Sequence, residues 1–479
     1  MLFKNIAVNS VWDDSRRVVP GSLFAALDGP NRRGEEFIPQ AVEQGAVVIL
    51  LSEKSQEAFS ARYPQVKFVG VADPRQAFRT AVEAFYGRPS EQVRAIGVTG
   101  TNGKTTITYF LEAILAAAGK SSGVVGTVNY RVAGKVVPST NTTPGLLDNQ
   151  IFLADLRQRG ITHAVLEVSS HALHQGRVDL IAFRGALFTN LTGDHIDYHG
   201  TMEAYFAAKS LLFTGLAADA YAVINVDDSY GRKLAALTRA RVFTYGIEPG
   251  NSAEVYAQVH EFGRQGARFD IHFPGGKVEI NTVFTGKHNV YNILAAFAAG
   301  LGEGFDPQVI KKGIEALKNV PGRLERVDCG QDFEVFIDYA HTDDGLKNVL
   351  QALQEVKHKR LIVVFGCGGD RDRTKRPRMG KVACELADLS IITSDNPRGE
   401  DPAGIIAEVI PGFTKNNYEV QVDREAAIGR AIELASRGDI ILLAGKGHET
   451  YQVLKEGSVD FVERDIVKRV VAERAACSR

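Results

Sequence analysis

The feature that most constrains the fold is a short run rich in glycine and threonine, Gly97-Val98-Thr99-Gly100-Thr101-Asn102-Gly103-Lys104-Thr105-Thr106. It follows an apolar, strand-like segment at 93–98 and opens a helical pattern at 105–118. Between a strand and a helix, small residues let backbone N–H groups turn inward around a polyphosphate. Lys104 has the charge to neutralise terminal phosphates, and Thr105 has a hydroxyl that suits Mg²⁺. The run predicts an ATP-binding loop; the alternative is a Gly-Lys-Thr without a nucleotide role, which the flanking strand and helix disfavour.

The composition is that of an ordinary globular chain. Apolar residues make up 44% and charged residues 24% of its 479 residues, which is typical of a soluble protein of about three domains. The 56 basic and 57 acidic residues nearly cancel, which argues against a general nucleic-acid or membrane surface. Four scattered cysteines fit a reduced cytosol better than a disulfide framework or a zinc site. Since the sequence shows neither a signal peptide nor a membrane span, we expect a cytoplasmic protein without nucleic-acid or membrane partners.

Strand-like and helical patterns alternate in three α/β units, at 1–88, 89–322 and 323–479, with Gly87-Arg88-Pro89-Ser90 as a linker after the first. Residues 240–285 differ, because their apolar runs suggest an antiparallel insert that includes 241–245. The clearest elements are helical patterns at 74–86, 105–118 and 289–301 and strands at 93–98, 163–168, 185–188, 334–337, 360–365, 389–393 and 439–443.

Polar clusters follow several of the central strands. Glu167, at the end of one strand, is a candidate magnesium ligand that would complement Thr105; the alternative is a cap for the next helix. The stretch Asp194-His195-Ile196-Asp197-Tyr198-His199 is a candidate metal or phosphate site, or else a solvated loop. Lys209 lies in an amphipathic helical pattern, and nothing in its spacing distinguishes it from a solvated charge.

In the third unit, loops rich in glycine and charge follow three strands, at 366–373, 393–398 and 445–449. Arg371 and Arg398 offer bidentate contacts to carboxylates. Asp395 and Glu449 have the charge to hold an ammonium group. Because open α/β sheets bind ligands outside the carboxyl ends of their strands, these loops predict a site for a zwitterionic, amino-acid-like ligand. Separate surface ion pairs are the alternative.

Four motifs together resemble the Mur ligases, which build the peptide stem of peptidoglycan: the loop at 100–106, Glu167-Val168-Ser169-Ser170-His171, Asp194-His195 and Asp338-Tyr339-Ala340-His341. The resemblance covers essentially the whole chain and is greatest to the members that extend the UDP-linked dipeptide. It implies a UDP-binding α/β domain, a central P-loop ATPase domain with a mostly parallel sheet, and a C-terminal Rossmann-like domain. It also implies a monomeric, ATP-dependent amide ligase that acts on small molecules with Mg²⁺ as cofactor and ATP as co-substrate.

The resemblance implies roles for individual positions. The implied catalytic residues are Lys104, Lys209, Glu167 and His195, with Lys209 carbamylated to N6-carboxylysine so that its anion supports a second Mg²⁺. The implied magnesium ligands are Thr105, Glu167, His195 and the Lys209 carbamate. The implied ATP contacts are Gly100, Thr101, Asn102, Gly103, Lys104, Thr105 and Thr106, with Asn289 toward adenine, Arg323 toward phosphate and Asp338 toward ribose. The implied UDP-substrate contacts are Ser15, Asn141, Thr142, Thr143, Ser169, Gln175 and Arg177.

The amino acid to be joined is indicated by Asp395-Asn396-Pro397-Arg398, which matches the motif of the family members that add meso-2,6-diaminopimelate. Arg371, Gly445 and Glu449 lie where the family binds the distal end of that amino acid. The resemblance thus implies joining of diaminopimelate, through an acyl phosphate, to the D-glutamyl γ-carboxylate of UDP-N-acetylmuramoyl-L-alanyl-D-glutamate. The alternatives are an L-lysine-adding member of the family, a ligase like folylpolyglutamate synthase and a non-catalytic P-loop protein.

Two positions depart from the family pattern. Asp343 stands where the family commonly has proline, and Thr192-Gly193 stands where it often has Ser-Arg. Neither departure removes an implied ligand, but both bear on the geometry of their loops.

Overall fold

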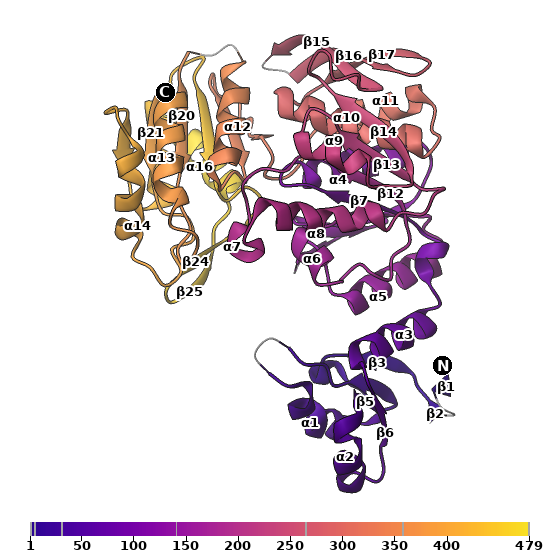
Figure 1. Cartoon of the computed structure of the whole chain (residues 1–479). Helices are drawn as coiled ribbons and strands as arrows, with labels where there is room; N and C mark the ends of the chain where they lie inside the picture. The colour runs from indigo at the N-terminus through magenta and orange to yellow at the C-terminus, as the bar shows by residue number, and fades with distance from the viewer. Residues whose placement is uncertain are drawn as a thin grey trace. The chain divides into compact units, whose positions relative to one another are not determined.

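The computed structural model describes residues 2–3, 6–29, 32–139, 141–263, 266–356 and 359–477. The chain divides into two compact units (Figure 1). The first comprises Met1–Ala95, Thr143–Ala164 and His171–Phe183, and the second comprises Ile96–Thr142, Val165–Ser170 and Arg184–Arg479. Segments from the range 89–322 therefore fold with the N-terminal part of the chain, and the boundaries expected at 88 and 322 stay predictions.

The first unit is built on a parallel sheet of four strands in the order β3-β4-β5-β6. Helix α3 (Pro74–Tyr86) matches the predicted helix; the Asp73 side chain caps its start and left-handed Gly87 ends it. Its apolar face packs on the sheet together with Leu147, which explains why α5 (Leu146–Gln158) belongs to this unit. The other elements are β1 (Leu2–Phe3), β2 (Ile6–Ala7), β3 (Ser10–Trp12), η1 (Ser15–Arg17), β4 (Ser22–Ala25), η2 (Gly34–Phe37), α1 (Ile38–Glu43), β5 (Ala46–Ser52), η3 (Glu53–Ser55), α2 (Gln56–Arg62), β6 (Lys67–Val71) and η4 (Pro89–Glu91).

The second unit contains an eleven-stranded sheet in the order β10-β9-β8-β11-β7-β12-β13-β14-β15-β16-β17. Helices α4 (Lys104–Ala117) and α10 (Lys287–Gly302) pack on it, and Phe110, Ile114, Ile293 and Phe297 lie in their shared core. The strands are β7 (Arg94–Thr99), β8 (Ser122–Val125), β9 (Asn129–Val132), β10 (Lys135–Pro138), β11 (His163–Glu167), β12 (Phe183–Phe188), β13 (Tyr221–Asn225), β14 (Arg241–Gly246), β15 (Val255–Gly263), β16 (Gly266–Phe273) and β17 (Gly276–Thr282).

The expectation of an antiparallel insert at 240–285 is wrong for its first strand. β14 pairs in parallel with both β13 and β15, and only β15, β16 and β17 form an antiparallel meander. Helix α9 (Ser229–Ala235) connects β13 to β14, and a helical crossover of this kind allows parallel pairing. An apolar run predicts a strand, but its direction depends on the neighbour with which it pairs.

The C-terminal part of this unit has a six-stranded sheet in the order β18-β19-β23-β20-β21-β22, parallel except for β18. Along β20 (Leu361–Phe365), alternate residues face opposite helical layers: Leu361, Val363 and Phe365 pack with α12 and α13, whereas Ile362 and Val364 pack with α15 and α16. This is the doubly wound arrangement expected of a Rossmann-like domain.

The remaining elements of the second unit place the loops of the site. They are α7 (Ile196–His199), α8 (Met202–Thr214), α11 (Pro307–Ala316), β18 (Glu325–Arg326), β19 (Glu334–Asp338), α12 (Asp343–Gln354), α13 (Lys375–Leu386), β21 (Leu389–Ile392), α14 (Pro402–Val409), η5 (Ile410–Gly412), β22 (Tyr418–Val420), α15 (Arg424–Leu434), β23 (Ile440–Ala444), β24 (Tyr451–Leu454), β25 (Gly457–Asp460) and α16 (Glu463–Cys477). Helix α6 (Ser170–His174) begins in the second unit, but its other residues belong to the first. In the described part of the chain, no helix has the length and apolarity that crossing a bilayer requires.

Candidate active site

The glycine-rich loop between β7 and α4 is held against the end of β12. Gly100 has a φ of 143°, and a Cβ there would lie 1.8 Å from Thr189 Oγ1. The backbone N–H groups of Thr101 and Asn102 donate to the carbonyl and side-chain oxygens of Asn190, both at 2.9 Å. Only glycine fits this close approach, and the contacts give the loop one conformation.

Two lysines share one backbone carbonyl in this loop. Lys104 Nζ donates to the carbonyl oxygens of Gly100 at 3.0 Å and Thr101 at 2.9 Å. Lys209 Nζ, from α8, donates to the same Gly100 oxygen at 2.9 Å. Burial and then the nearby Lys104 charge lower the pKa of Lys209 well below its usual value, and burial also lowers the pKa of Lys104. The Lys209 side chain, expected from spacing alone to be solvated, is only 1% exposed.

Tyr205 belongs to the same group and was missed in the sequence. Its hydroxyl lies 3.2 Å from Thr101 Oγ1, and Lys209 Nζ lies 4.6 Å from the centre of its ring. Tyr205 and Lys209 are four residues apart on α8 and therefore share one face of the helix. This four-residue spacing is the feature of the sequence that could have indicated that Tyr205 lies beside Lys209.

Thr105 and Glu167 meet as expected. Glu167 Oε2 accepts from Thr105 Oγ1 at 3.1 Å and from Thr127 Oγ1 at 2.8 Å, and Oε1 accepts from the Thr127 N–H at 2.9 Å. Both Thr105 and Glu167 are buried. These hard oxygen donors fit Mg²⁺. Within the described ranges, no three His, Cys, Asp or Glu side chains form a metal-binding group, so a bound ion would complete its shell with phosphate oxygens or water.

His195 lies beside the α8 residues, in the loop before α7. Its backbone is left-handed, with a φ of 55°, and its N–H donates to Asp194 Oδ1 at 2.8 Å. Its ring lies edge-on to that of Tyr205, with the centres 6.1 Å apart, and 46% of its side chain is exposed. The structure thus brings His195 near Tyr205, while Glu167 lies against Thr105.

Of the three expected nucleotide contacts, Asn289 lies at the start of α10, Asp338 at the end of β19 and Arg323 just before β18. Asn289 Nδ2 donates to the Thr285 carbonyl at 2.9 Å. Asp338 accepts from the N–H groups of Leu324 at 2.7 Å and Ala340 at 2.8 Å, while burial raises its pKa. Arg323 Nη2 donates to Thr105 Oγ1 at 3.3 Å, which brings this arginine to the phosphate loop.

The loops after β21 and β23 form one polar cluster. Asn396 Nδ2 donates to Glu449 Oε2 at 2.8 Å, and a Cβ on Gly445 would lie 2.9 Å from Asp395 Oδ2. Lys446, for which no role was expected, donates to Asn396 Oδ1 at 3.0 Å and to Glu449 Oε2 at 3.2 Å. A lysine between two glycines at the end of a buried strand was the available signal.

The two arginines expected to bind a carboxylate lie on adjoining loops. Arg398 has a left-handed φ of 51°, and its Nη1 donates to the Gly369 carbonyl at 2.8 Å. The Gly369 N–H donates to the Asn396 carbonyl at 2.9 Å, which ties this loop to the one that contains Pro397. Arg371 is exposed, two residues after Gly369.

The expected UDP-substrate residues are distributed over both units. In the first unit, Ser15 Oγ donates to Gln40 Oε1 at 2.7 Å, and Arg177 donates to the Thr143 carbonyl at 3.0 Å and to Gln175 Oε1 at 2.9 Å. In the second unit, Thr142 Oγ1 lies 3.1 Å from Thr127 Oγ1, the Asn141 carbonyl accepts from Tyr130 Oη at 2.8 Å, and Ser169 follows β11. Each unit therefore holds part of the expected set.

Both departures from the family pattern have local partners. Thr192 Oγ1 donates to Asp344 Oδ2 at 3.0 Å, and Asn102 Nδ2 donates to the same oxygen at 3.1 Å. Asp343 begins α12 and accepts from Arg378 Nε at 2.9 Å. Both departures thus have polar partners in the fold.

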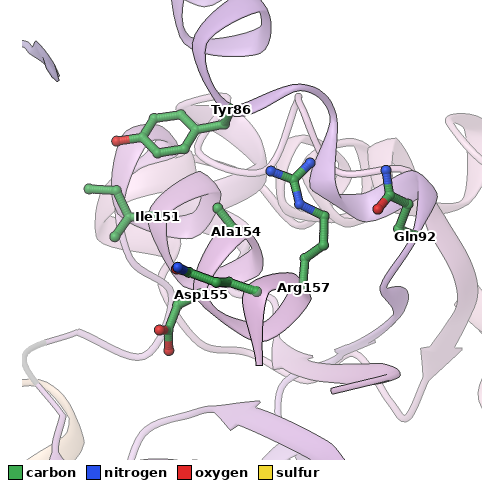
Figure 2. Close-up of a pocket in the computed structure, with 7 residues that line it drawn as sticks. Tyr86, Gln92, Ile151, Ala154, Asp155 and Arg157 are labelled. Carbon is green, nitrogen blue, oxygen red and sulfur yellow. The ribbon is translucent and has the colours of Figure 1, made fainter. Parts of the chain in front are cut away.

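A separate cavity of about 570 Å³ lies in the first unit (Figure 2). Figure 2 shows that Ile151, Ala154, Asp155 and Arg157 reach it from α5, alongside Tyr86. None of its lining residues belongs to the expected site.

A phosphate-type loop at the end of β7 and a cluster of opposite charges after β21 and β23 are the two parts that an ATP-dependent ligase of small molecules requires. Family models match 8–86 as "Mur ligase family, catalytic domain", 98–300 as "Mur ligase middle domain" and 322–447 as "Mur ligase, glutamate ligase domain". The chain belongs to the Mur ligase family, and its three domains stand in the expected order.

Similar proteins cover nearly the whole chain. A protein of Solibacter usitatus named UDP-N-acetylmuramoyl-L-alanyl-D-glutamate--2,6-diaminopimelate ligase is 47% identical over 462 residues, which are 96% of this chain and 92% of that protein. One of the same name from Syntrophomonas wolfei is 42% identical, over 97% and 94%. A solved structure of a ligase of that name has a TM-score of 0.72 at 32% identity, over 98% and 95%. Folylpolyglutamate synthase of Mycobacterium tuberculosis, complexed with ADP and AMPPCP, shares the fold at 19% identity and a TM-score of 0.64, over 77% and 91%.

Proposed function

We propose that this protein is the ATP-dependent ligase that joins meso-2,6-diaminopimelate to the D-glutamyl γ-carboxylate of UDP-N-acetylmuramoyl-L-alanyl-D-glutamate. The products are the UDP-linked tripeptide, ADP and phosphate, and the reaction serves peptidoglycan precursor synthesis. The observation that carries the proposal is the 47% identity, over 96% of the chain, to a relative named for this reaction. The charge pattern of the C-terminal loops agrees with an amino-acid substrate.

The first step activates the substrate carboxylate. Its γ-carboxylate attacks the γ-phosphate of ATP, and an acyl phosphate and ADP result. Lys104 and the N–H groups of Gly100, Thr101, Asn102, Gly103, Thr105 and Thr106 stabilise the charge that develops on the transferring phosphoryl group. Thr105, Glu167 and His195 would hold Mg²⁺, and carbamylated Lys209 would support a second ion; a bound ion would supply positive charge that neutralises the phosphates. Asn289, Arg323 and Asp338 contact the rest of the nucleotide.

Carbamylation of Lys209 is supported by the state of its amine. Only a neutral amine attacks CO₂, and burial together with Lys104 lowers the pKa of Lys209 toward that state. The product is an anion, which removes the repulsion between two ammonium groups on the Gly100 oxygen. Lys104 remains as the cation that faces phosphate.

The second step uses the amino-acid cluster. One amine of diaminopimelate attacks the acyl phosphate and expels phosphate. Arg371 and Arg398 bind the distal carboxylate, and Asp395 and Glu449 bind the distal ammonium, with Asn396, Pro397 and Gly445 shaping the loops. L-Lysine lacks that distal carboxylate, which favours diaminopimelate over a lysine-adding reaction. Ser15, Asn141, Thr142, Thr143, Ser169, Gln175 and Arg177 bind the UDP-linked substrate.

An assay of ADP release tests the proposal. Purified protein receives ATP, Mg²⁺ and the UDP-linked dipeptide, with diaminopimelate or L-lysine added separately. ADP release that depends on diaminopimelate supports the proposal. ADP release with lysine and not with diaminopimelate refutes the choice of amino acid. The absence of ADP release with either amino acid refutes the function. Glutamate with a folate substrate tests the folylpolyglutamate synthase alternative.

A monomeric state and a cytoplasmic location are part of the same proposal. Light scattering after size-exclusion chromatography tests whether the protein is a monomer.

A further inference from the structure

The ammonium group of Lys446 is buried in the polar cluster that the loops after β21 and β23 form. Its side chain is 0% exposed. Nζ donates to Asn396 Oδ1 at 3.0 Å and to Glu449 Oε2 at 3.2 Å, and it lies 3.7 Å from Asp395 Oδ1. A buried ammonium is costly unless it is paired and hydrogen-bonded, so the fold around Lys446 is organised to hold its charge.

Lys446 determines the orientation of Asn396. The Asn396 Oδ1 atom accepts from Lys446 Nζ and from the Val453 N–H at 2.9 Å, so an amide oxygen and not an NH₂ group fits there. The Nδ2 group then points to Glu449 Oε2, at 2.8 Å. With Oε2 held by two donors, the Glu449 carboxylate has one orientation and Oε1 remains to accept from a ligand.

Asp395, Glu449 and Lys446 form a cluster in which negative charge is in excess by one. Asp395 and Glu449 contribute two carboxylates, whereas Lys446 contributes one ammonium. The neighbouring Arg424 is buried in an ion pair with Glu463 at 2.8 Å, and its charge is matched there. Asp395 Oδ1 is buried and has no hydrogen-bond partner among the described residues. A buried acceptor without a donor, in a cluster of net charge −1, favours a ligand that brings an ammonium group.

We propose that Lys446 is a positioning residue that makes the site selective for an ammonium group at the distal end of the incoming amino acid. The inference rests on the proposed function and deepens it. Lys446 fixes Asn396 and Glu449, and it cancels one of the two carboxylate charges, so that one ligand ammonium completes the neutralisation. Arg398 follows Asn396 by two residues on the same loop and recognises the carboxylate of the same end, so analogues that lack one distal group each separate the two recognitions.

Two analogues of diaminopimelate each lack one distal group. L-2-Aminopimelate lacks the distal ammonium, and L-lysine lacks the distal carboxylate. In the wild-type protein, we expect kcat/KM for 2-aminopimelate to be at least about 100-fold below that for diaminopimelate, because a site built to pair a polar group rejects an analogue without it. The factor by which kcat/KM for an analogue lies below that for diaminopimelate is called its penalty. L-Lysine should also have a penalty, because it has no distal carboxylate for Arg398 to bind.

The variant Lys446→Met distinguishes a role of Lys446 in orienting Glu449 from a role only in the stability of the fold. We expect its KM for diaminopimelate to rise about tenfold or more and its penalty against 2-aminopimelate to fall below about tenfold, because Glu449 loses its orientation. The lysine penalty and the KM for ATP should stay within about twofold of wild type, since Arg398 and the phosphate loop are untouched. Lys381→Met is the matched control, because Lys381 is 69% exposed on α13 and outside the site; both penalties should stay unchanged.

The outcomes are distinct. If both penalties of Lys446→Met change together, or neither changes, Lys446 is structural and the proposal is overturned. If thermal unfolding shows that Lys446→Met does not fold, Lys446→Gln, which keeps a donor and removes the charge, takes its place with the same expectations. Wild-type protein that uses 2-aminopimelate as well as diaminopimelate overturns the proposal without any variant. Wild-type protein that releases ADP with none of the three amino acids refutes the proposed function itself.

Discussion

Replacement of Gly100 by alanine tests whether the geometry of the phosphate loop governs the use of ATP. At Gly100 the new Cβ would lie 1.8 Å from Thr189 Oγ1 and 3.1 Å from the Asn190 N–H nitrogen. Relief of that overlap requires the loop to move by about 1 Å, a displacement that costs about 100-fold in rate when it misplaces a catalytic group. Because Lys104 and Lys209 both donate to the Gly100 carbonyl, they move with it.

A matched control isolates the clash from backbone strain. Gly119 follows α4 with a left-handed φ of 68°, and a Cβ there meets nothing within 4 Å. In each variant, alanine at positive φ costs about 1–2 kcal/mol of stability. We expect kcat/KM for ATP, measured by ADP release, to fall about 100-fold in Gly100→Ala, or about 2.7 kcal/mol, and to stay within about twofold of wild type in Gly119→Ala. Equal activity of the two variants would refute the reasoning.

Three further perturbations test separate features. Wild-type protein depleted of CO₂ should lose ADP release and regain it with bicarbonate, whereas Lys209→Met should stay inactive in both conditions. Arg398→Lys should raise the KM for diaminopimelate about tenfold, because a point charge replaces a bidentate fork, with the KM for ATP unchanged. Burial lowers the pKa of His288 to about 4. Since the unfolded chain then binds the proton first, the free energy of unfolding should fall, on the order of 3 kcal/mol from this group, between pH 6.5 and pH 4. In urea titrations, His288→Gln should lose less over that range.

Each expectation has an outcome that contradicts it. Bicarbonate that leaves the depleted wild type inactive would argue against a carbamate at Lys209. An Arg398→Lys variant with equal KM values for diaminopimelate would remove the assigned carboxylate contact. Parallel pH profiles for wild type and His288→Gln would show that this histidine is not held neutral by the fold.

Much of the fold follows from local pattern. The helix expected at 74–86 matches α3, and those expected at 105–118 and 289–301 match α4 and α10 within one or two residues at each end. Apolar period and capping residues lie within one segment, so the sequence displays them directly. The direction of β14 does not follow, because pairing depends on strands distant in sequence.

The site divides in the same way. The phosphate loop and the Glu167 position follow from spacing after a strand, and Thr105 Oγ1 of the loop lies 3.1 Å from Glu167 Oε2. Thr127 has no local signature in the sequence, and the weak signals at Tyr205 and Lys446, a four-residue spacing and two flanking glycines, do not by themselves indicate a site. Their roles come from contacts across the chain, such as Lys446 with Asn396, fifty residues away.

By itself, the sequence determined the family, the order of three α/β domains and the chemistry available at each strand end, because motifs and periodicity are local. Only the tertiary structure decided which charges are buried. Lys209 and Lys446 are ordinary lysines in the sequence, yet one donates to a carbonyl 109 residues away and the other lies between two carboxylates. Burial is a property of every segment packed around a side chain, so it is set when the chain folds.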